Sequence, residues 1–421
     1  MSSFVQALLS NPGVPLQARQ HALDRASSDP GLPTPSPTSS FWLRSPHPDL
    51  SRNGPGQDHN GRPAIVMLEA RFFAATAEEF ADLEREHGLG AAEKIMRFKL
   101  AHLQEILAVA DEYGVTEEAQ ARQVQFLSVY FDQGSWREAR RRFQRLKEGL
   151  PEVTVEWTVY GKDEVPKEFS LPHAQGIVAG PAGAIWPYRF VRGVLARLRA
   201  KYPKNLQIET STPVTNIEGH SNGSSNGPGR IFSVRGQMSA QYPGSRFRCQ
   251  GKQHSWLFNY DRGAGEMMMF GGGISDIGVS TDSKQSLHVD IHLSGALSAV
   301  FGLENWGSTP GVEQMWTGNM GFSADGLPWV GRLPASVTQR GPVGMEDRGG
   351  EWISAAFSGE GMVLAWLCGK ALGRMLLLHD GELLDGDCAD LSWFPEQMLV
   401  TEVRANTAAL PRSAASVSPN L

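Results

Sequence analysis

Apolar residues recur at helical spacing in the first half of the chain. Between residues 80 and 113 they fall three or four positions apart, which is the pattern of one buried helix face. The positions that carry this period are Ala92, Ile95, Met96, Leu100, Leu103, Ile106, Leu107 and Ala110. The pattern predicts a helix over 80–113 that belongs to the core and not to a site, with Gly114 as its C-terminal cap. A basic helix is predicted over 135–150, its arginines facing solvent.

Short apolar runs predict strands. The runs cover residues 64–69, 125–131, 154–160, 206–209 and 212–217. The methionines of residues 267–269 are expected to belong to the core. The glycines within residues 179–183 predict a tight passage of the chain, after which Pro187 opens a helix that reaches about Tyr202.

The C-terminal part carries a strand, a glycine-flanked turn and a helix in succession. The strand begins at Trp352, the turn holds Gly359 and Gly361, and the helix extends to about Leu378. Glycines let a ligand approach the backbone closely. Backbone N–H groups at the start of a helix have no partner within it and attract an electron-rich or anionic atom. The pattern therefore predicts a turn that faces a ligand.

Composition and charge exclude several classes of protein. The 421 residues suffice for two domains or one large composite. The formal net charge is −6 and no basic patch stands out, so nucleic acid is not an expected partner. No apolar run approaches the ~18 residues of a membrane span, and the N-terminus shows no signal peptide. We therefore expect a soluble, cytoplasmic protein.

The sequence shows no constellation for metal or nucleophilic chemistry. Its three cysteines, Cys249, Cys368 and Cys388, are too few and too scattered for a disulfide framework or a zinc site. Cys368 lies on the apolar C-terminal helix and is expected to be a buried structural thiol. The eleven histidines show no metalloprotease spacing, and we expect no metal.

Two C-terminal motifs, residues 316–334 and 352–362, together resemble the closing segment of the D-amino-acid-oxidase-like family of FAD-dependent oxidoreductases, in particular its fungal branch. The resemblance covers roughly residues 39–403 and implies strands over residues 234–238 and 267–273. It implies an α/β fold with two interleaved domains. One is an FAD-binding, Rossmann-like domain that is incomplete here, and the other is an antiparallel-sheet substrate domain.

The resemblance also implies domain boundaries. The FAD-binding domain would consist of residues 41–114, 183–230 and 340–403, and the substrate domain of residues 115–182 and 231–339. Residues 1–40 would form a proline-punctuated and flexible N-terminal arm, and residues 404–421 a C-terminal tail.

FAD is the cofactor that the resemblance implies. Glu69, at the end of the predicted strand 64–69, would accept hydrogen bonds from the adenosine ribose. The backbone of Val214 would meet adenine, and Asp325 and Gly331 would shape the turn beside the flavin. The ligand-facing turn would lie against the flavin ring and ribityl chain through residues Ser358, Gly359, Glu360, Gly361 and Met362.

The substrate implied by the family is a small amine or amino-acid-like molecule. The family oxidises a C–N bond, and hydride passes to the flavin and then to oxygen. An arginine would grip a substrate carboxylate, with Arg262, Arg235 and Arg332 as candidates. Arg332 also suits a structural role. Tyr260 and Trp186 either line the pocket or pack as buried aromatics.

Four segments expected of the family are absent. The glycine-rich pyrophosphate turn should lie within residues 51–62, which hold glycines but lack the preceding strand and the following helix. The other gaps fall after Arg71, near residues 221–228 and at residues 261–266. Either the chain has diverged and binds FAD weakly or not at all, or the gene was read without some coding segments.

Three functions follow from these patterns. The leading one is a FAD-dependent oxidoreductase acting on an amine or amino-acid-like molecule. The alternative is a degenerate, non-catalytic relative that acts as a binding or interaction protein. An NAD(P)-dependent Rossmann enzyme is disfavoured, because no glycine fingerprint survives in the chain.

Overall fold

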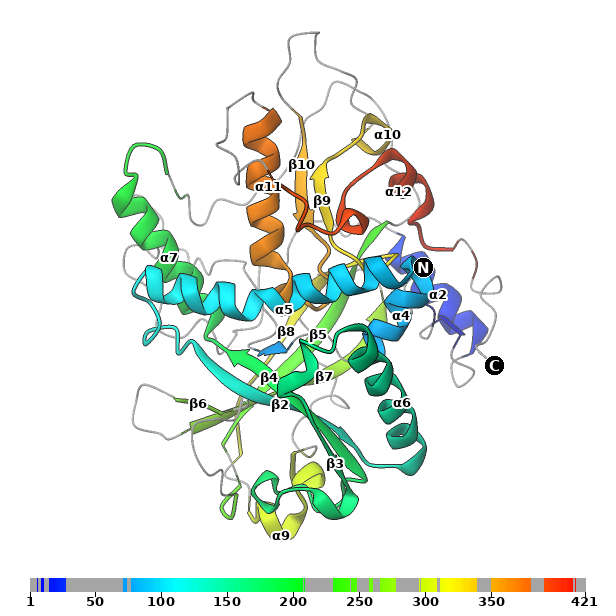
Figure 1. Ribbon diagram of the computed structural model, residues 1–421, viewed down its shortest axis with the longest axis vertical. Coiled ribbons are helices and arrows are strands. Elements are labelled where there is room, and N and C mark those ends of the chain that lie inside the picture. The colour runs from blue at the N-terminus through cyan, green and yellow to red at the C-terminus, as the bar shows by residue number, and fades with distance from the viewer. Residues whose placement is uncertain are drawn as a thin grey trace.

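The computed structural model shows a long helix crossing the middle of the molecule, with sheets and helices on both sides of it (Figure 1). That helix is α5 (Leu89–Glu112). In this view strands β2, β3 and β4 lie below it, and α11, β9 and β10 lie above it. The structure describes residues 6, 9–10, 15–27, 71–73, 77–206, 208, 230–242, 244–247, 257–259, 266–277, 295, 297–308, 311–338, 350–379, 390–411 and 413.

The first sheet is built around β4 and is antiparallel throughout its described strands. Its members are β1 (Arg71–Phe73), β2 (Arg122–Tyr130), β3 (Thr158–Gly161) and β4 (Gly176–Ala184). Strand β2 pairs with β4 along its whole length, and β1 and β3 also pair with β4. The strand predicted over 125–131 is therefore confirmed, beginning three residues earlier.

Two predictions in this region are wrong. The strand predicted over 154–160 begins only at Thr158, because residues 154–156 form a 3-10 turn (η2). Thr154 Oγ1 donates to the carbonyl oxygens of Leu150 and Pro151 at 3.2 Å, which favours the turn. The glycines within 179–183 lie in strand β4 rather than in a tight passage. A Cβ at Gly180 would lie 2.7 Å from a ring carbon of Phe126, so close packing explains this glycine.

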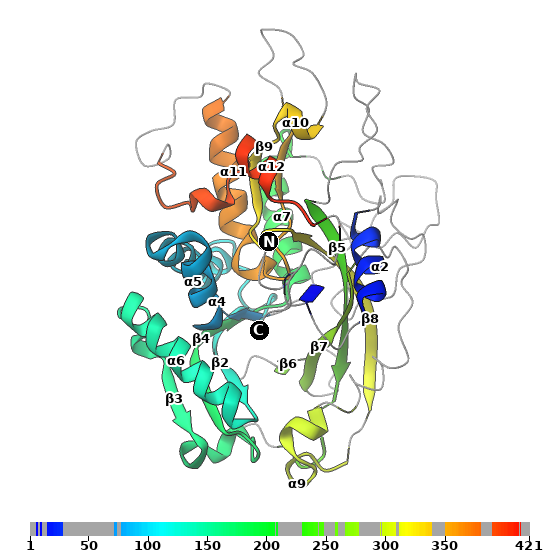
Figure 2. The ribbon, with the colours of Figure 1, turned by 90° about the vertical axis from the view of Figure 1, so that its right-hand side faces the viewer.

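The second sheet is also antiparallel, with the strand order β6-β7-β5-β8. Its strands are β5 (Ile231–Gln241), β6 (Leu257–Asn259), β7 (Glu266–Ile277) and β8 (Val312–Ser323). The strands predicted over 234–238 and 267–273 are confirmed, and Met268 and Met269 are buried as expected. Helix α2 (Leu16–Ala26) lies beside this sheet and contacts β7 (Figure 2).

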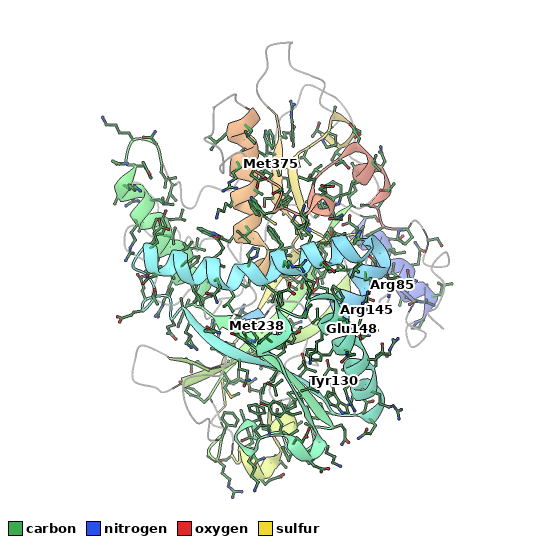
Figure 3. The ribbon with its side chains drawn as sticks, in the orientation of Figure 1. Arg85, Tyr130, Arg145, Glu148, Met238 and Met375 are labelled. Carbon is green, nitrogen blue, oxygen red and sulfur yellow. The ribbon has the colours of Figure 1, made fainter. Side chains whose placement is uncertain are left out.

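The helix predicted over 80–113 is two helices. They are α4 (Ala77–His87) and α5, and Gly88 separates them with a φ of 82°. Only glycine takes this left-handed conformation without strain, so the chain turns here. Helices α6 (Gln133–Gly149) and α7 (Pro187–Lys201) lie close to their predicted bounds. Arg85, Arg145 and Glu148 lie where α4 meets α6 (Figure 3), and Arg145 pairs with Glu84 across that contact.

The C-terminal strand, turn and helix are confirmed. Strand β10 (Trp352–Ala355) pairs with β9 (Trp329–Arg332), and the 3-10 turn η5 (Gly361–Val363) leads into α11 (Ala365–His379). Helix α11 contacts α5, β9 and β10. The remaining short elements are η3 (Lys162–Glu164), η4 (Lys167–Phe169), α9 (Leu303–Trp306), α10 (Ala335–Thr338), η7 (Glu396–Met398) and α12 (Glu402–Thr407).

One large hydrophobic cluster joins the parts on both sides of α5. Met238 on β5 belongs to it and Met375 on α11 packs against it, and the two lie on opposite sides of α5 (Figure 3).

Among the described residues, no helix combines the length and the apolar character needed to cross a bilayer. The predicted strands 64–69 and 212–217, and residues 207 and 209 of the strand predicted over 206–209, lie outside the described residues.

Candidate functional site

The segment between β10 and α11, residues 356–362, has a constrained backbone; we refer to it as the C-terminal turn. Ala356, Ser358 and Gly359 have φ angles of 62°, 53° and 88°. All three lie in the left-handed region, which costs a residue with a side chain roughly 1–2 kcal/mol. Such a backbone persists only where surrounding contacts fix it, and it concentrates at functional sites. The C-terminal turn is therefore the candidate site.

The edge of β8 fixes one part of the C-terminal turn. The N–H of Ser358 donates to the carbonyl oxygen of Gly321 at 3.0 Å, and the N–H of Ser323 donates to Ser358 Oγ at 3.2 Å. Strand β8 is at the end of the strand order, so its outer edge is open to this pairing. The turn thus continues the hydrogen bonding of the second sheet.

A buried ammonium group on α5, that of Lys99, fixes another part of the C-terminal turn. Lys99 Nζ donates to Glu360 Oε2 at 2.6 Å and also to Glu79 on α4. The Lys99 side chain is 0% exposed, whereas those of Glu79 and Glu360 are 22% and 36% exposed. Burial lowers the pKa of Lys99, but the two carboxylates outweigh it and the net shift is upward, so Lys99 stays charged. Burial, together with the charge of Glu360, raises the pKa of Glu79 to about 7.

His102, one helical turn after Lys99, binds the start of α11. Its Nε2 accepts a hydrogen bond from the N–H of Leu367 at 3.1 Å, and its Nδ1 lies 2.9 Å from the carbonyl oxygen of Phe98. The Leu367 donor requires a lone pair on Nε2, so the proton sits on Nδ1. Burial lowers the pKa of His102 to about 4, so the ring is neutral near pH 7. A neutral imidazole thus satisfies one of the first N–H groups of α11.

The side chains of the C-terminal turn are bound within the protein, whereas part of its backbone is not. Ser358 and Glu360 bind β8 and Lys99, and Met362 is buried in the main core. In the described part of the chain, the N–H groups of Gly359, Gly361 and Met362 donate to no acceptor. A Cβ atom at Gly361 would have one neighbouring atom within 4 Å, the Cβ of Phe357 at 4.0 Å. Packing therefore does not require glycine at position 361, and the open space there would admit the electron-rich edge of a flat ligand.

Asp325 has a structural partner that the sequence did not reveal. Its carboxylate binds Arg404 through two contacts, Nε to Oδ2 at 2.7 Å and Nη2 to Oδ1 at 3.0 Å. Arg404 also donates to the carbonyl oxygens of Leu327 and Pro328, both at 2.8 Å. Asp325 is thus committed to holding the turn before β9. Gly331 lies within β9 with a φ of 130°, next to the segment at Val400.

The described structure does not gather the other predicted site residues around the turn. Trp186 is 0% exposed in the main core, with the guanidinium of Arg189 3.8 Å from its ring centre, so buried packing describes it. Arg235 is half-buried in β5, and Arg332 is exposed at the end of β9. Four predicted residues lie outside the described part of the chain: Glu69, Val214, Tyr260 and Arg262.

Sequence reasoning missed Lys99 and His102, although a signal was present. Both occupy the buried face of α5, in register with Ala92, Ile95 and Ile106. A lysine and a histidine at positions that the helical period reserves for apolar residues indicate buried partners. We therefore revise the expectation that this helix has no part in a site, because Lys99 on α5 binds Glu360 in the candidate site.

A small pocket lies next to Lys99. Its volume is about 160 Å³, and it is bounded by α5, the first sheet and η5, through Lys99, Leu100, Leu103, Gln104, Gln123, Val153, Glu156, Pro181 and Val363. Ligand pockets usually measure about 300–1,000 Å³, so this one does not hold a cofactor by itself.

Cys368 is buried as predicted, and burial raises the pKa of its thiol. The described residues contain no group of three or more side chains that could hold a metal.

The fold is similar to that of solved oxidoreductases. Glycine oxidase from Geobacillus kaustophilus matches 81% of this chain and 89% of its own, with a TM-score of 0.50 and 13% identity. The match to iminodiacetate oxidase from Chelativorans sp. BNC1 covers 78% of this chain and 89% of the oxidase, with a TM-score of 0.48 and 12% identity. L-proline dehydrogenase from P. horikoshii matches 81% and 88% (TM-score 0.47, 16% identity). No family model and no curated protein sequence match the chain. The likeness to glycine oxidase confirms the predicted α/β fold with an antiparallel-sheet part.

Proposed function

We propose that this chain is a FAD-dependent oxidoreductase that oxidises a C–N bond of a small amine or amino-acid-like molecule. The C-terminal turn carries the proposal: its side chains bind the protein, whereas the N–H groups of Gly359, Gly361 and Met362 donate to no acceptor among the described residues. The fold supports it, because a protein named glycine oxidase shares that fold. Membership of the fungal branch and a cytoplasmic location belong to the same proposal.

The turn would hold the flavin end of FAD. Backbone N–H groups suit the electron-rich edge of the ring, and Gly361 lets the ring approach the backbone. When bound, the flavin supplies a hydride acceptor that oxygen reoxidises. The contribution of this chain is to place the donors and to keep them fixed through β8 and α5.

The adenosine end would be held by residues outside the described part of the chain. Glu69 would accept hydrogen bonds from the ribose, and the backbone of Val214 would meet adenine. These residues, with the C-terminal turn, define the FAD-binding domain over residues 41–114, 183–230 and 340–403. Asp325 and Gly331 support the neighbouring turn and strand instead of touching the cofactor, since Arg404 binds both oxygens of Asp325.

The substrate would lie on the side of the antiparallel sheet, in the domain of residues 115–182 and 231–339. Arg262 and Arg235 are the candidates for gripping a substrate carboxylate, with Tyr260 lining the pocket. The exposure of Arg332 at the end of β9 favours its structural alternative. The complete burial of Trp186 likewise favours core packing over contact with substrate.

Weak cofactor binding is part of the proposal. The pyrophosphate needs N–H donors at a helix start, and the sequence of residues 51–62 lacks the pattern of a strand followed by a glycine-rich turn and a helix. This observation favours one second candidate function, a non-catalytic relative that binds other molecules through the same scaffold.

Flavin content separates the two functions. The full chain is expressed, desalted and assayed for the flavin-to-protein ratio, and then for hydrogen peroxide production with a panel of amines and amino acids in added FAD. We expect less than stoichiometric flavin, recovery of the yellow colour with added FAD, and peroxide from at least one substrate. Folded protein that takes up no FAD even in excess would establish the non-catalytic alternative.

A further inference from the structure

We propose that Lys99 and His102 are positioning residues that hold the C-terminal turn in its ligand-binding shape. We refer to these two side chains as the α5 bracket. The inference rests on the proposed function, because it names the part of the chain that keeps the flavin-facing donors in place. Neither residue touches the cofactor in this proposal; both act through the turn.

The geometry of the bracket matches the segment it holds. Lys99 and His102 are three residues apart on a helix, so they share one face and lie about one turn from each other. Lys99 binds Glu360, 261 positions later, and His102 binds the N–H of Leu367, 265 positions later. The two contacts therefore fix both ends of residues 360–367. The open N–H groups of Gly361 and Met362 lie between these ends.

The chemistry of Lys99 argues against a role in stability alone. A buried ion pair is often no more stabilising than apolar side chains of similar size, because burying two charges costs about as much as their attraction returns. Apart from His102, the buried neighbours of Lys99 on the same face are apolar, and an apolar residue at position 99 would extend the core. An ammonium, in contrast, has directed hydrogen bonds, and these fix where Glu360 lies.

The chain provides a matched control pair. Lys370 on α11 binds Glu105 on α5, with Nζ 3.2 Å from Oε1 and 3.3 Å from Oε2. This pair joins α5 to α11, as the His102–Leu367 contact does, but its side chains are 41% and 36% exposed. Lys370→Met therefore makes the same chemical change as Lys99→Met without touching the C-terminal turn.

The first measurement is amide hydrogen exchange of residues 356–367 in the full-length protein without added cofactor. We expect Lys99→Met and Glu360→Gln to speed exchange in this segment roughly tenfold or more, the factor expected for one charge-assisted hydrogen bond. Lys370→Met should leave it unchanged. The double variant should exchange no faster than Lys99→Met alone, because Lys99→Met already removes the contact with Glu360. Glu360→Gln keeps the test valid if Lys99→Met does not fold, since Glu360 is 36% exposed.

The second experiment measures two quantities for each variant: the FAD dissociation constant by titration, and the melting temperature. Lys99→Met and Glu360→Gln, the bracket variants, should each weaken FAD binding roughly tenfold. Their melting temperatures should stay near that of Lys370→Met. If the wild type takes up no FAD, the proposed function fails, and the exchange experiment still decides the bracket. If the wild type binds FAD and the bracket variants match Lys370→Met in both measurements, the bracket is overturned and the proposed function stands.

Discussion

Arg404 and Asp325, 79 positions apart in the sequence, form a two-point ion pair at 2.7 and 3.0 Å. Their side chains are only 10% and 20% exposed. Arg404 sits on α12, at the first position of the predicted C-terminal tail, and joins it to the turn before β9. The beginning of this tail is therefore a structural part of the molecule.

Replacement of Arg404 should destabilise the fold. Arg404→Ala removes both ion-pair contacts of Asp325 and the hydrogen bonds to the carbonyl oxygens of Leu327 and Pro328, of which Leu327 keeps the hydroxyl of Ser323 as a donor. We expect a loss of about 2–4 kcal/mol in the free energy of unfolding. Arg404→Lys should recover only part of it, because an ammonium cannot form the two-point contact. Urea denaturation measures both. Arg141→Ala, in an exposed pair with Glu138, is the control and should cost less than about 1 kcal/mol. Equal losses at the two sites would contradict the prediction.

Two glycines of the C-terminal turn should respond differently to alanine. Gly359 has a φ of 88°, so Gly359→Ala should cost about 1–2 kcal/mol of stability through backbone strain. A Cβ at Gly361 meets only the Cβ of Phe357 at 4.0 Å, so Gly361→Ala should leave stability nearly unchanged. Under the proposed function, Gly361→Ala should still weaken FAD binding because the methyl group occupies the ligand's side. Thermal denaturation beside FAD titration tests both, and unchanged FAD affinity in Gly361→Ala would argue against the turn as the flavin site.

The buried carboxyl of Glu79 should make stability depend on pH. Glu79 faces Lys99, Glu360 and Asp82, and its pKa rises from 4.5 to about 7 in the folded chain. Between these values the folded state binds more protons than the unfolded state, so the contribution of Glu79 to stability falls as pH rises. The depressed pKa of His102 acts in the opposite direction below about pH 6.5.

A difference measurement isolates Glu79 from His102. The unfolding free energy of Glu79→Gln minus that of the wild type should increase as pH rises from about 5 to about 7. Denaturant titrations across this range provide the values. A difference that stays constant with pH would show that Glu79 titrates normally.

Glu69 is the predicted adenosine contact, and Glu69→Ala should reduce FAD affinity. A hydrogen bond to a charged group contributes about 1.5–3 kcal/mol, or roughly tenfold to a hundredfold in the dissociation constant. FAD titration of the apo-protein measures it. Equal affinities for the wild type and the variant would mean that Glu69 only ends a strand.

The sequence by itself determined the elements whose local pattern is strong. The helical period of residues 135–150, Pro187 at a helix start and the glycine-flanked segment after Trp352 each predict structure through neighbouring residues alone. Local sterics and one-sided burial set these elements, and no distant partner is needed. The same reasoning predicts that the C-terminal turn faces a ligand.

Only the tertiary structure decided what holds that turn. Glu360 meets Lys99 and Leu367 meets His102 across more than 260 positions, and no local pattern encodes such pairings. The period of α5 marks both side chains as buried, yet burial alone does not name a partner. Long-range hydrogen bonds arise only when the core brings α5 and α11 together, because an ammonium or imidazole removed from water must find its partner within the fold.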